Sequence, residues 1–433
     1  MNRRSCLGLL GSASALLLLS PLRLSGGEKK RTSLEPLPQE APAKIFFAKG
    51  EDVRKVTRQL LETLGGMEAI IDKEDIVVLK PNSQQVAQGA TNTDVMAAFI
   101  EAVLGIPGFQ GEIIIADNHQ SQEENSRGWT TDKRNGRFNL NELVEFFQNK
   151  GFRNVTKYHW HPAGPNPTPL MMDGYGDHVV SHPSEGDGYV WPEDLYYLSP
   201  YGNKTILPYP IFTSACSGVT IDLKNGAYKN GRYTGQPVKF INFSALNHHG
   251  LYTGVTASVK NFMGVVDMSC GYPAPKPEGT YNTHFNGATS LFKLLSRHRG
   301  RLERIPSFWE FYLSPHIFRF RYTGGVLGRF MKTIRKADLH IITAIRVGWG
   351  SRTDPNMSYT ANAVVAGYDP VALDCWASEN VLLKATKEVR APKQYVELND
   401  PKIRGGPLQS FLEECRLELG GTLDLKDMSV IKV

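Results

Sequence analysis

Short apolar runs alternate along the chain with segments in which apolar residues recur every three or four positions. A short apolar run predicts a buried strand, and the three-to-four spacing predicts a helix with one buried face. In the first 160 residues the predicted strands are 45–48, 76–79, 112–116 and 155–160. The helical spacing covers 51–65, 94–104 and 140–149. Such alternation favours an α/β fold, with a mainly parallel sheet and helices on both faces.

The pattern resumes in the second half of the chain after an interruption. Residues 161–210 are rich in Pro, Gly, Asp and Tyr and lack periodicity, which predicts a loop-rich excursion. Further strands are predicted at 218–221, 238–243, 339–342 and 363–366, with a helix at 371–384. We expect one α/β domain over residues 44–433. Its ligands should bind where loops follow the carboxyl ends of the parallel strands.

Residues 292–336 form a second interruption, in which Lys and Arg interleave with Phe, Tyr and Trp. A basic and aromatic helical pair can lie on an anionic membrane surface or on a partner protein. Alternatively, the segment is an insertion whose aromatic rings pack inward while its arginines face water. The second interpretation is favoured, and membrane-surface contact through 292–336 stays open.

The chain begins with the pattern of an export signal. Arg3 and Arg4 precede an apolar stretch at 7–19 that is too short to span a bilayer comfortably. The paired arginines resemble a twin-arginine signal, which implies export of a folded protein to the periplasm or another extracytoplasmic space. No clear Ala-x-Ala cleavage site follows, so an uncleaved anchor is the alternative. We expect an export signal at 1–26 and a linker at 27–43.

Composition narrows the classes of function. The chain has 433 residues, of which 41% are hydrophobic and 21% charged, which is typical of a globular protein with a large core. The formal net charge is +6, but six basic residues lie within the first 31 residues. Little basic excess remains for the body of the protein, so we expect no nucleic-acid partner.

Cysteine spacing bears on the cofactors. The chain has five cysteines and no C-x-x-C sequence, so the usual iron–sulfur and zinc-ribbon spacings are excluded. No iron–sulfur cluster is expected from the chain's own cysteines, and the identity of any other cofactor is unknown. A disulfide is compatible with export, but the sequence does not pair the cysteines. Those that follow the leader are Cys216, Cys270, Cys375 and Cys415.

Three segments carry candidate chemistry, and the first is Lys80-Pro81-Asn82 at the end of a predicted strand. The next helix begins near Thr91 to Thr93, whose hydroxyls can cap it. An ammonium group beside a helix N-terminus makes an anion site, with Lys80 and Asn82 binding the substrate. Equally, Pro81 ends the strand, Asn82 turns the chain and Thr93 caps the helix.

The second segment, 245–264, holds two adjacent imidazoles, those of His248 and His249, in a predicted loop. Thr256, Lys260 and Asn261 follow on a short turn and helix, and Gly264 can serve as the helix C-cap. Imidazole, hydroxyl, ammonium and amide groups within one unit suit proton transfer and anion binding. A buried polar network that positions a loop is the alternative, and the functional interpretation is slightly favoured.

The third segment, 364–374, leads into a predicted helix. Asp369 is a natural N-cap, with Pro370 at the first helical position. Asp374 lies in an otherwise apolar stretch of that helix. A buried carboxylate without a partner costs on the order of several kcal/mol, so we expect Asp374 to be paired. Lys80, Lys260 or a histidine is the expected partner.

In this order, the stretches K-P-N, T-x-x-x-K-N-x-x-G and A-G-x-D-P-V-A-x-D resemble the domain-of-unknown-function family 362. The resemblance spans about residues 75–385 and implies an α/β fold. Some members carry an attached ferredoxin-type domain, which this sequence lacks, and no activity is established for the family. Members usually have a lysine where Asn247 stands here, which puts a conserved activity in doubt. The matching positions are Lys80, Pro81, Asn82, Thr256, Lys260, Asn261, Gly264, Asp369 and Asp374.

A metal site is the less favoured interpretation of the loop-rich excursion. His178 and His182 lie there among several acidic residues, and these are metal-ligand types. Acidic residues are common in any loop rich in Gly and Pro, however. The metal candidates therefore rank below the three segments.

Three hypotheses follow. In the first, the protein is an exported enzyme that acts on a small anion: Lys80 and Lys260 hold the anion, His248 or His249 moves a proton, and Asp374 orients a cationic group. In the second, the same pocket serves a non-catalytic ligand-binding or redox-accessory protein with a redox partner. In the third, the protein is a metalloprotein loaded before export. The first hypothesis requires the three segments to meet in space.

Overall fold

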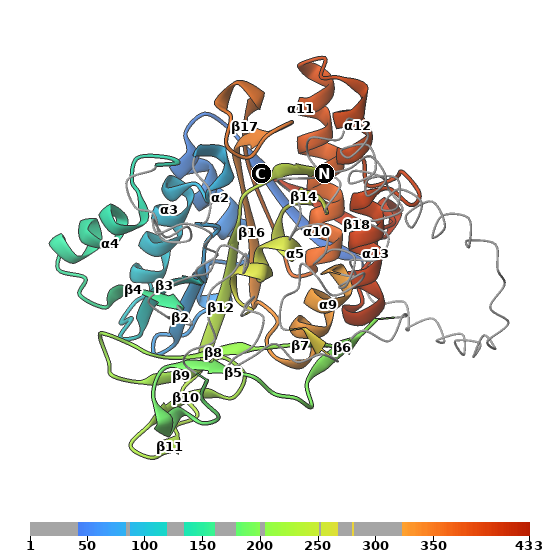
Figure 1. Cartoon of the computed structure of the whole chain (residues 1–433). Helices are drawn as coiled ribbons and strands as arrows, with labels where there is room; N and C mark the ends of the chain where they lie inside the picture. The colour runs from blue at the N-terminus through green and yellow to red at the C-terminus, as the bar shows by residue number, and fades with distance from the viewer. Residues whose placement is uncertain are drawn as a thin grey trace, which may run out of the picture. The chain divides into compact units, whose positions relative to one another are not determined.

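The computed structural model describes residues 42–83, 87–118, 134–160, 179–199, 204–250, 253–266, 279–280 and 323–433. Their main element is a ten-stranded sheet with the order β18-β1-β17-β16-β12-β2-β3-β4, to which the hairpin β13–β14 is joined (Figure 1). The strands on the path are β1 (Ala43–Lys49), β2 (Ile76–Lys80), β3 (Glu112–Asn118), β4 (Val155–Trp160), β12 (Val238–Ser244), β16 (Leu339–Gly348), β17 (Ser358–Gly367) and β18 (Met428–Lys432).

The strands of this sheet are mostly parallel. Neighbouring strands from β4 through β3, β2 and β12 to β16 all pair in parallel. Strand β17 is antiparallel to both of its neighbours, β16 and β1, and β18 pairs in parallel with β1. The predicted fold class is therefore confirmed. The carboxyl ends of five adjacent parallel strands lie at one edge of the sheet, and this edge positions the candidate site.

Helices cover both faces of the sheet because successive strand residues point to opposite sides. In β2, Ile76 and Val78 join one apolar core, whereas Val77 and Leu79 join the other. The second core packs under α2 (Val53–Thr63), α3 (Thr93–Leu104) and α4 (Leu140–Asn149). The first core packs under α9 (Thr323–Thr333), α10 (Pro370–Ala377) and α13 (Pro407–Leu419), on the opposite side in Figure 1.

Local capping signals set the helix starts, with one change from the prediction. Asn92, and not a threonine, caps α3: its side chain accepts from the backbone N–H groups of Asp94 and Val95. The Thr93 hydroxyl instead bonds the carbonyl of Phe138 at 2.8 Å. Thr91 is used in a longer-range contact, because its hydroxyl donates to the Phe243 carbonyl at 2.8 Å. These threonines therefore join the helix start to neighbouring segments.

The predicted loop-rich excursion at 161–210 contains short strands, so this prediction is partly wrong. The two small sheets that these strands join also take strands from 220–233 and 279–280. A five-stranded sheet has the order β11-β10-β9-β8-β5, and a three-stranded sheet has the order β15-β7-β6. Strands of two to five residues are too short for an alternating pattern to register in the sequence. They are β5 (Gly188–Val190), β6 (Tyr196–Leu198), β7 (Lys204–Ile206), β8 (Tyr209–Thr213), β9 (Thr220–Asp222), β10 (Gly226–Lys229), β11 (Arg232–Tyr233) and β15 (Gly279–Thr280).

The helix predicted at 371–384 is real but interrupted. It comprises α10, a π-helical turn at Ser378–Leu382 and α11 (Leu383–Glu388). Helix α12 (Lys393–Asn399), α13 and β18 were not predicted. The predicted export signal at 1–26 and all but the last two residues of the predicted linker at 27–43 lie outside the described residues, as does most of the basic aromatic insertion. Within the described part of the chain, no helix combines the length and apolarity that crossing a membrane requires.

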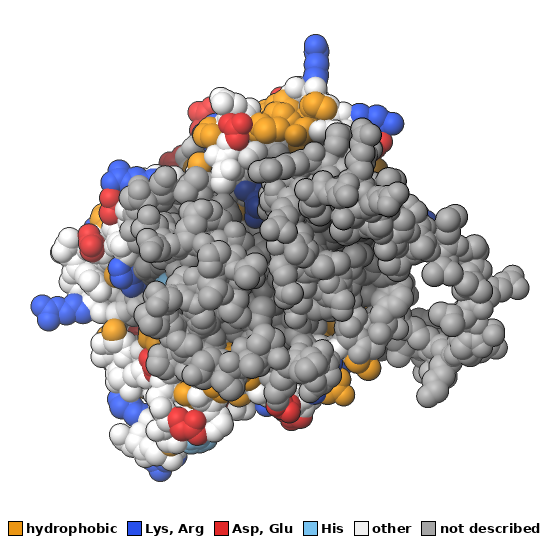
Figure 2. Space-filling view, viewed as in Figure 1, with side chains coloured by type: hydrophobic (Ala, Val, Ile, Leu, Met, Phe, Trp, Pro, Cys, Tyr) orange, Lys and Arg blue, Asp and Glu red, His pale blue; other side chains and the backbone are white. Residues whose placement is uncertain are grey.

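Figure 2 shows the charged side chains of the described residues on one face of the molecule. On the face shown in Figure 2, the Lys and Arg side chains of the described residues are dispersed among acidic and uncharged groups. A nucleic-acid interface usually gathers its basic side chains into one patch or stripe. The partner prediction itself stays untested.

Candidate functional site

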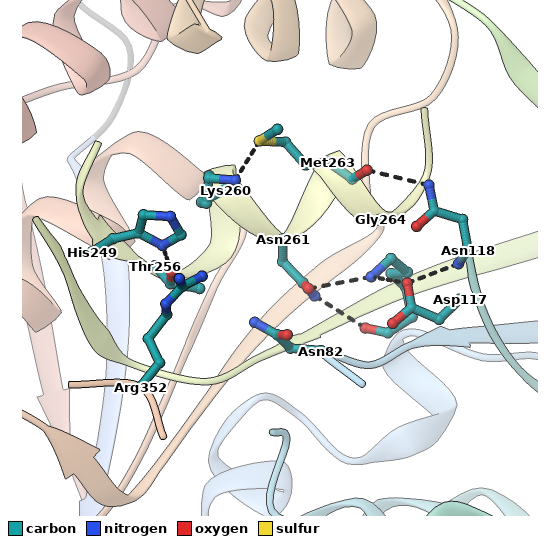
Figure 3. Close-up of a pocket in the computed structure, with 11 residues that line it drawn as sticks. Asn82, Asp117, Asn118, His249, Thr256, Lys260, Asn261, Met263, Gly264 and Arg352 are labelled. Carbon is teal, nitrogen blue, oxygen red and sulfur yellow. Dashed lines mark hydrogen bonds and ion pairs between the residues drawn. The ribbon is translucent and has the colours of Figure 1, made fainter. Parts of the chain in front are cut away.

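A small cavity lies at the carboxyl edge of the parallel strands (Figure 3). Its volume is about 30 Å³. Five elements contribute its lining: the ends of β2 and β3, the β13–β14 hairpin, the short helical segment 258–264, and the loop between β16 and β17. The lining residues are Lys80, Asn82, Asp117, Asn118, His249, Thr256, Lys260, Asn261, Met263, Gly264 and Arg352.

Lys80 lines this cavity as one half of a buried ion pair. Its ammonium lies 2.7 Å from Asp117 Oδ1, and both side chains are almost completely buried. The same nitrogen donates to the Pro81 carbonyl and to Asn261 Oδ1 at 3.2 Å. An ammonium has three N–H donors, and three acceptors surround this one. The predicted role of Lys80 in holding an anion is therefore not supported by its geometry.

Asp117 is held as firmly as its partner. Its Oδ2 accepts from the backbone N–H of Ser83 at 3.0 Å and from the Ser83 hydroxyl, and its Oδ1 accepts from the N–H of Asn118 at 2.9 Å. Burial raises the pKa of Asp117 and lowers the pKa of Lys80, while the attraction between the two charges opposes both shifts. The pair is a structural support of the cavity.

The ion pair between Lys80 and Asp117 leaves no room for a side chain at Gly264. A Cβ atom added at Gly264 would lie 2.4 Å from both Lys80 Nζ and Asp117 Oδ1. The predicted C-cap role is wrong: Phe262 caps the helix α5 (Ser258–Asn261), and Val265 caps the 3₁₀ turn that ends at Gly264. Close packing, and not a left-handed backbone, explains the glycine.

Asn261 connects α5 to the sheet. Its amide nitrogen donates to Asn242 Oδ1 at 2.7 Å and to the Phe243 carbonyl at 3.1 Å, and its oxygen accepts from Lys80. Asn242 in turn lies 3.0 Å from His340 Nδ1. Burial lowers the pKa of His340 to about 3, which keeps this imidazole neutral. The Asn261 side chain is therefore occupied by the protein itself.

The two adjacent histidines face different surroundings. They lie in the strand β13 (Asn247–Gly250) and not in the predicted loop, so their side chains point to opposite sides. His249 lines the cavity, and its Nδ1 contacts the Thr256 hydroxyl. His248 bonds Asn399 Oδ1 at 2.7 Å, and burial lowers its pKa. Of the two predicted catalytic histidines, His249 alone has the position for the role.

Asp374 has no cationic partner among the described residues, contrary to the prediction. Its two carboxylate oxygens accept from the backbone N–H groups of Ser258 at 2.7 Å and Val259 at 2.8 Å, which caps α5. Burial raises the pKa of Asp374 to about 7 despite these hydrogen bonds. Asp374 does not line the cavity. It positions the turn that carries Lys260 and does not orient a cation.

Asp369 has the local role that its sequence context predicts. Its side chain accepts from the backbone N–H groups of Val371 and Ala372 at the start of α10. It also accepts from the N–H of Thr422 at 3.2 Å, which ties the C-terminal segment to the helix. Burial raises its pKa.

The remaining charge at the cavity is positive. Three cationic side chains and one carboxylate line it, so its formal excess is two positive charges. Lys80 and Asp117 neutralise each other, and the other two cationic side chains of the lining are those of Lys260 and Arg352. Figure 3 shows these two on the same side of the cavity as His249, with the Lys260 ammonium next to Met263 Sδ. Ammonium and guanidinium groups are the side-chain groups that proteins commonly use to bind anions.

The sequence interpretation missed four lining residues: Asp117, Asn118, Met263 and Arg352. The sequence does contain a signal that could have identified two of them, because Asp117 and Asn118 directly follow the predicted strand at 112–116. Polar residues at that point lie at the carboxyl edge of a parallel sheet. The sequence contains no such signal for Arg352, since only the fold of the β16–β17 loop brings this residue to the cavity.

Asn118 offers a ligand an acceptor. Its nitrogen donates to the Met263 carbonyl at 3.3 Å and the Val266 carbonyl at 2.7 Å. Its buried oxygen has no hydrogen-bond partner among the described residues. A bound molecule or a water with a donor group would satisfy it.

Asn247, where the family usually has a lysine, is a buried structural residue. Its nitrogen donates to the Gln88 carbonyl at 2.9 Å, and its oxygen accepts from the Gly348 N–H at 2.7 Å. It therefore joins the loop before α3 to the end of β16. The Asn247 side chain is uncharged, so it does not substitute for the ammonium group of that lysine.

Metal chemistry receives no support from the described residues. His178 lies outside them, and His182 is an N-cap whose ring accepts from the N–H of Ser184. No group of three or more His, Cys, Asp or Glu side chains within the described ranges has the arrangement of a metal site. Where the structure describes them, Cys216, Cys375 and Cys415 are free thiols.

Comparison with known families adds one finding. Residues 237–379 match the model of a domain of unknown function (DUF362). The chain contains a DUF362 domain. The match includes the second and third motifs and bears out the resemblance, while Lys80 lies outside it. Neither the curated proteins nor the solved structures include a match to this chain. The DUF362 domain therefore identifies the family and leaves the reaction open.

Proposed function

We propose that this DUF362 protein is an exported enzyme that binds a small anion between Lys260 and Arg352. The observation that carries the proposal is their convergence with His249 in one cavity. Lys80 does not contribute to the anion, because Asp117 and two further acceptors surround its ammonium. The cationic groups for the anion therefore come from α5 and from the β16–β17 loop.

The geometry also supports a proton-transfer role. His249 Nδ1 contacts the Thr256 hydroxyl, so the imidazole is held at a defined angle beside the two cations. An imidazole titrates near neutral pH and can accept or donate a proton at a bound ligand. Lys260 and Arg352 would hold the anion, Thr256 would orient the imidazole, and His249 would move the proton.

Binding is tested by calorimetric titration of the full chain with inorganic phosphate and with acetate at low ionic strength. Lys260→Met and Arg352→Met should each weaken binding roughly tenfold or more, because each removes a charged hydrogen-bond donor. Lys224→Met is the matched control, since Lys224 is exposed in the β9–β10 turn. Equal affinities in all three variants would contradict the anion site.

Turnover is tested with His249→Gln, which keeps a polar side chain of similar reach. Hydrolysis of p-nitrophenyl phosphate and p-nitrophenyl acetate provides the first assay. Loss of turnover with retained phosphate affinity supports the enzyme. Phosphate binding without turnover in the unaltered protein favours the alternative, a non-catalytic ligand-binding or redox-accessory protein that uses the same cavity.

A further inference from the structure

A second and larger cavity lies between the edge strand β4 and the five-stranded sheet. Its volume is about 310 Å³, which falls in the size range of small-molecule sites. Tyr158 and Trp160 of β4 line one side. The other side comes from Asp187, from Gly188 and Tyr189 of β5, and from Pro210 and Ile211 of β8. All of these residues are described by the structure, and none belongs to the anion site.

Trp160 supplies a hydrogen-bond donor without an acceptor. The residue is 1% exposed, and its indole nitrogen has no hydrogen-bond partner among the described residues. Its ring packs against Phe212 and Phe240, with centroid distances of 5.5 and 6.5 Å, so the ring is fixed in place. Leaving a buried donor without an acceptor carries a desolvation cost. An acceptor atom on a bound molecule would remove that cost.

Asp187 supplies hydrogen-bond acceptors at the other end of this contrast, where Trp160 supplies a donor. Its Oδ1 accepts from the Thr213 hydroxyl at 2.6 Å and its Oδ2 from the Tyr158 hydroxyl at 2.5 Å. Each carboxylate oxygen has about two lone-pair positions, so each retains one for a further donor. Burial and the neighbouring Asp187 raise the pKa of Tyr158, which keeps that hydroxyl protonated. A ligand at this end of the cavity must therefore donate.

We infer that this second cavity binds a sugar or another polyol. A hydroxyl group both donates and accepts, so one polyhydroxylated molecule can satisfy Asp187 and the indole of Trp160 together. Its C–H surface would pack against the apolar side chains of Pro210 and Ile211. An organic cation would satisfy Asp187 but leave the indole without an acceptor, and an anion would be repelled by the carboxylate.

The two cavities share a strand pair but differ in chemistry. Trp160 stands opposite Asn118 across β4 and β3, and Asn118 lines the anion site. Tyr189 also donates from its hydroxyl to the Val265 carbonyl at 3.0 Å, next to Gly264. The polyol site does not depend on the proposed enzyme activity, and either proposal can fail without the other.

The chain has six tryptophans. The test labels the full chain with 5-fluorotryptophan and follows the ¹⁹F NMR resonances of these residues. Glucose, galactose, mannose, ribose and glycerol are titrated, with tetramethylammonium and inorganic phosphate as contrasting probes. We expect at least one polyol to shift, saturably, the resonance that is missing in Trp160→Phe. Calorimetric titration with that polyol should show roughly tenfold weaker binding to Trp160→Phe and to Asp187→Asn.

Trp376→Phe is the matched control, because Trp376 is 7% exposed and packs against Phe47, away from the cavity lining. It should leave the polyol affinity unchanged. Asp187 is exposed, so its isosteric replacement gives a folded variant even if Trp160→Phe is destabilised. The inference is overturned if no polyol shifts the Trp160 resonance, if tetramethylammonium alone does so, or if both cavity variants keep the original affinity.

Discussion

Replacement of Gly264 by alanine tests the packing that supports the anion site. The added Cβ would meet Lys80 Nζ and Asp117 Oδ1 at 2.4 Å and Lys80 Cε at 2.7 Å. Ordinary contacts between such atoms are about 3.5 Å. Lys80 cannot withdraw easily, because three acceptors hold its ammonium and its side chain is 1% exposed. Either the ion pair opens or the segment 262–264 moves away from the sheet.

The two responses have different costs. Overpacking that shifts the backbone costs about 1–3 kcal/mol. Separation of a buried ion pair costs about 3–5 kcal/mol, because each charge then lacks its partner. Because the protein takes the cheaper of the two responses, we expect Gly264→Ala to lower the free energy of unfolding by roughly 1–3 kcal/mol.

Urea unfolding followed by tryptophan fluorescence measures this change through the midpoint and the slope of the transition. Gly105→Ala is the control: this residue caps α3 with φ −79°, and its added Cβ would lie 3.2 Å from the nearest atom, the Glu101 carbonyl oxygen. The control should cost less than about 1 kcal/mol. A Gly264→Ala protein within about 0.5 kcal/mol of the unaltered chain would refute the reasoning.

Three further predictions concern charged side chains. Lys80→Met and Asp117→Leu should each cost about 3–5 kcal/mol, whereas the double variant should cost less than the sum, as a double-mutant cycle in urea would show. Burial raises the folded-state pKa of Asp374 to about 7, above the unfolded value near 4. The folded protein therefore binds the extra proton, and stability should fall as pH rises from about 4 to 7, with a smaller fall in Asp374→Asn. Replacement of both Arg3 and Arg4 by lysine should retain the protein inside the producing cell, and cell fractionation with an immunoblot measures this; unchanged export would contradict the twin-arginine interpretation.

Most of the central sheet was predictable because its signal is local. A strand buried on both faces is a largely continuous apolar run, so the predicted 76–79 and 112–116 agree closely with β2 and β3. The capping role of Asp369 was predictable for the same reason, since Asp-Pro before an apolar helix is itself a helix-start signal. Of the five-stranded sheet, β9 was predicted from the run at 218–221, whereas its other strands show too few alternations over two to five residues.

The site was predictable in its location and less so in its roles. The residues after the parallel strands and the residues of the 245–264 segment do meet in one cavity, as the order of strands and motifs indicated. The sequence did not show which group pairs with each charged side chain. Lys80 is paired with Asp117, 37 residues away in the chain, and Asp374 caps backbone amides more than a hundred residues away.

By itself, the sequence determined the fold class, the family and the segments that approach the carboxyl edge of the sheet, because apolar periodicity and short motifs act over a few residues. The tertiary structure decided which groups face the cavity and which charges remain for a ligand. It turned His248 away from the cavity, used Lys80 and Asp374 as supports, and brought in Arg352. The physical reason is that burial requires each polar group to find a partner, and those partners come from distant parts of the chain.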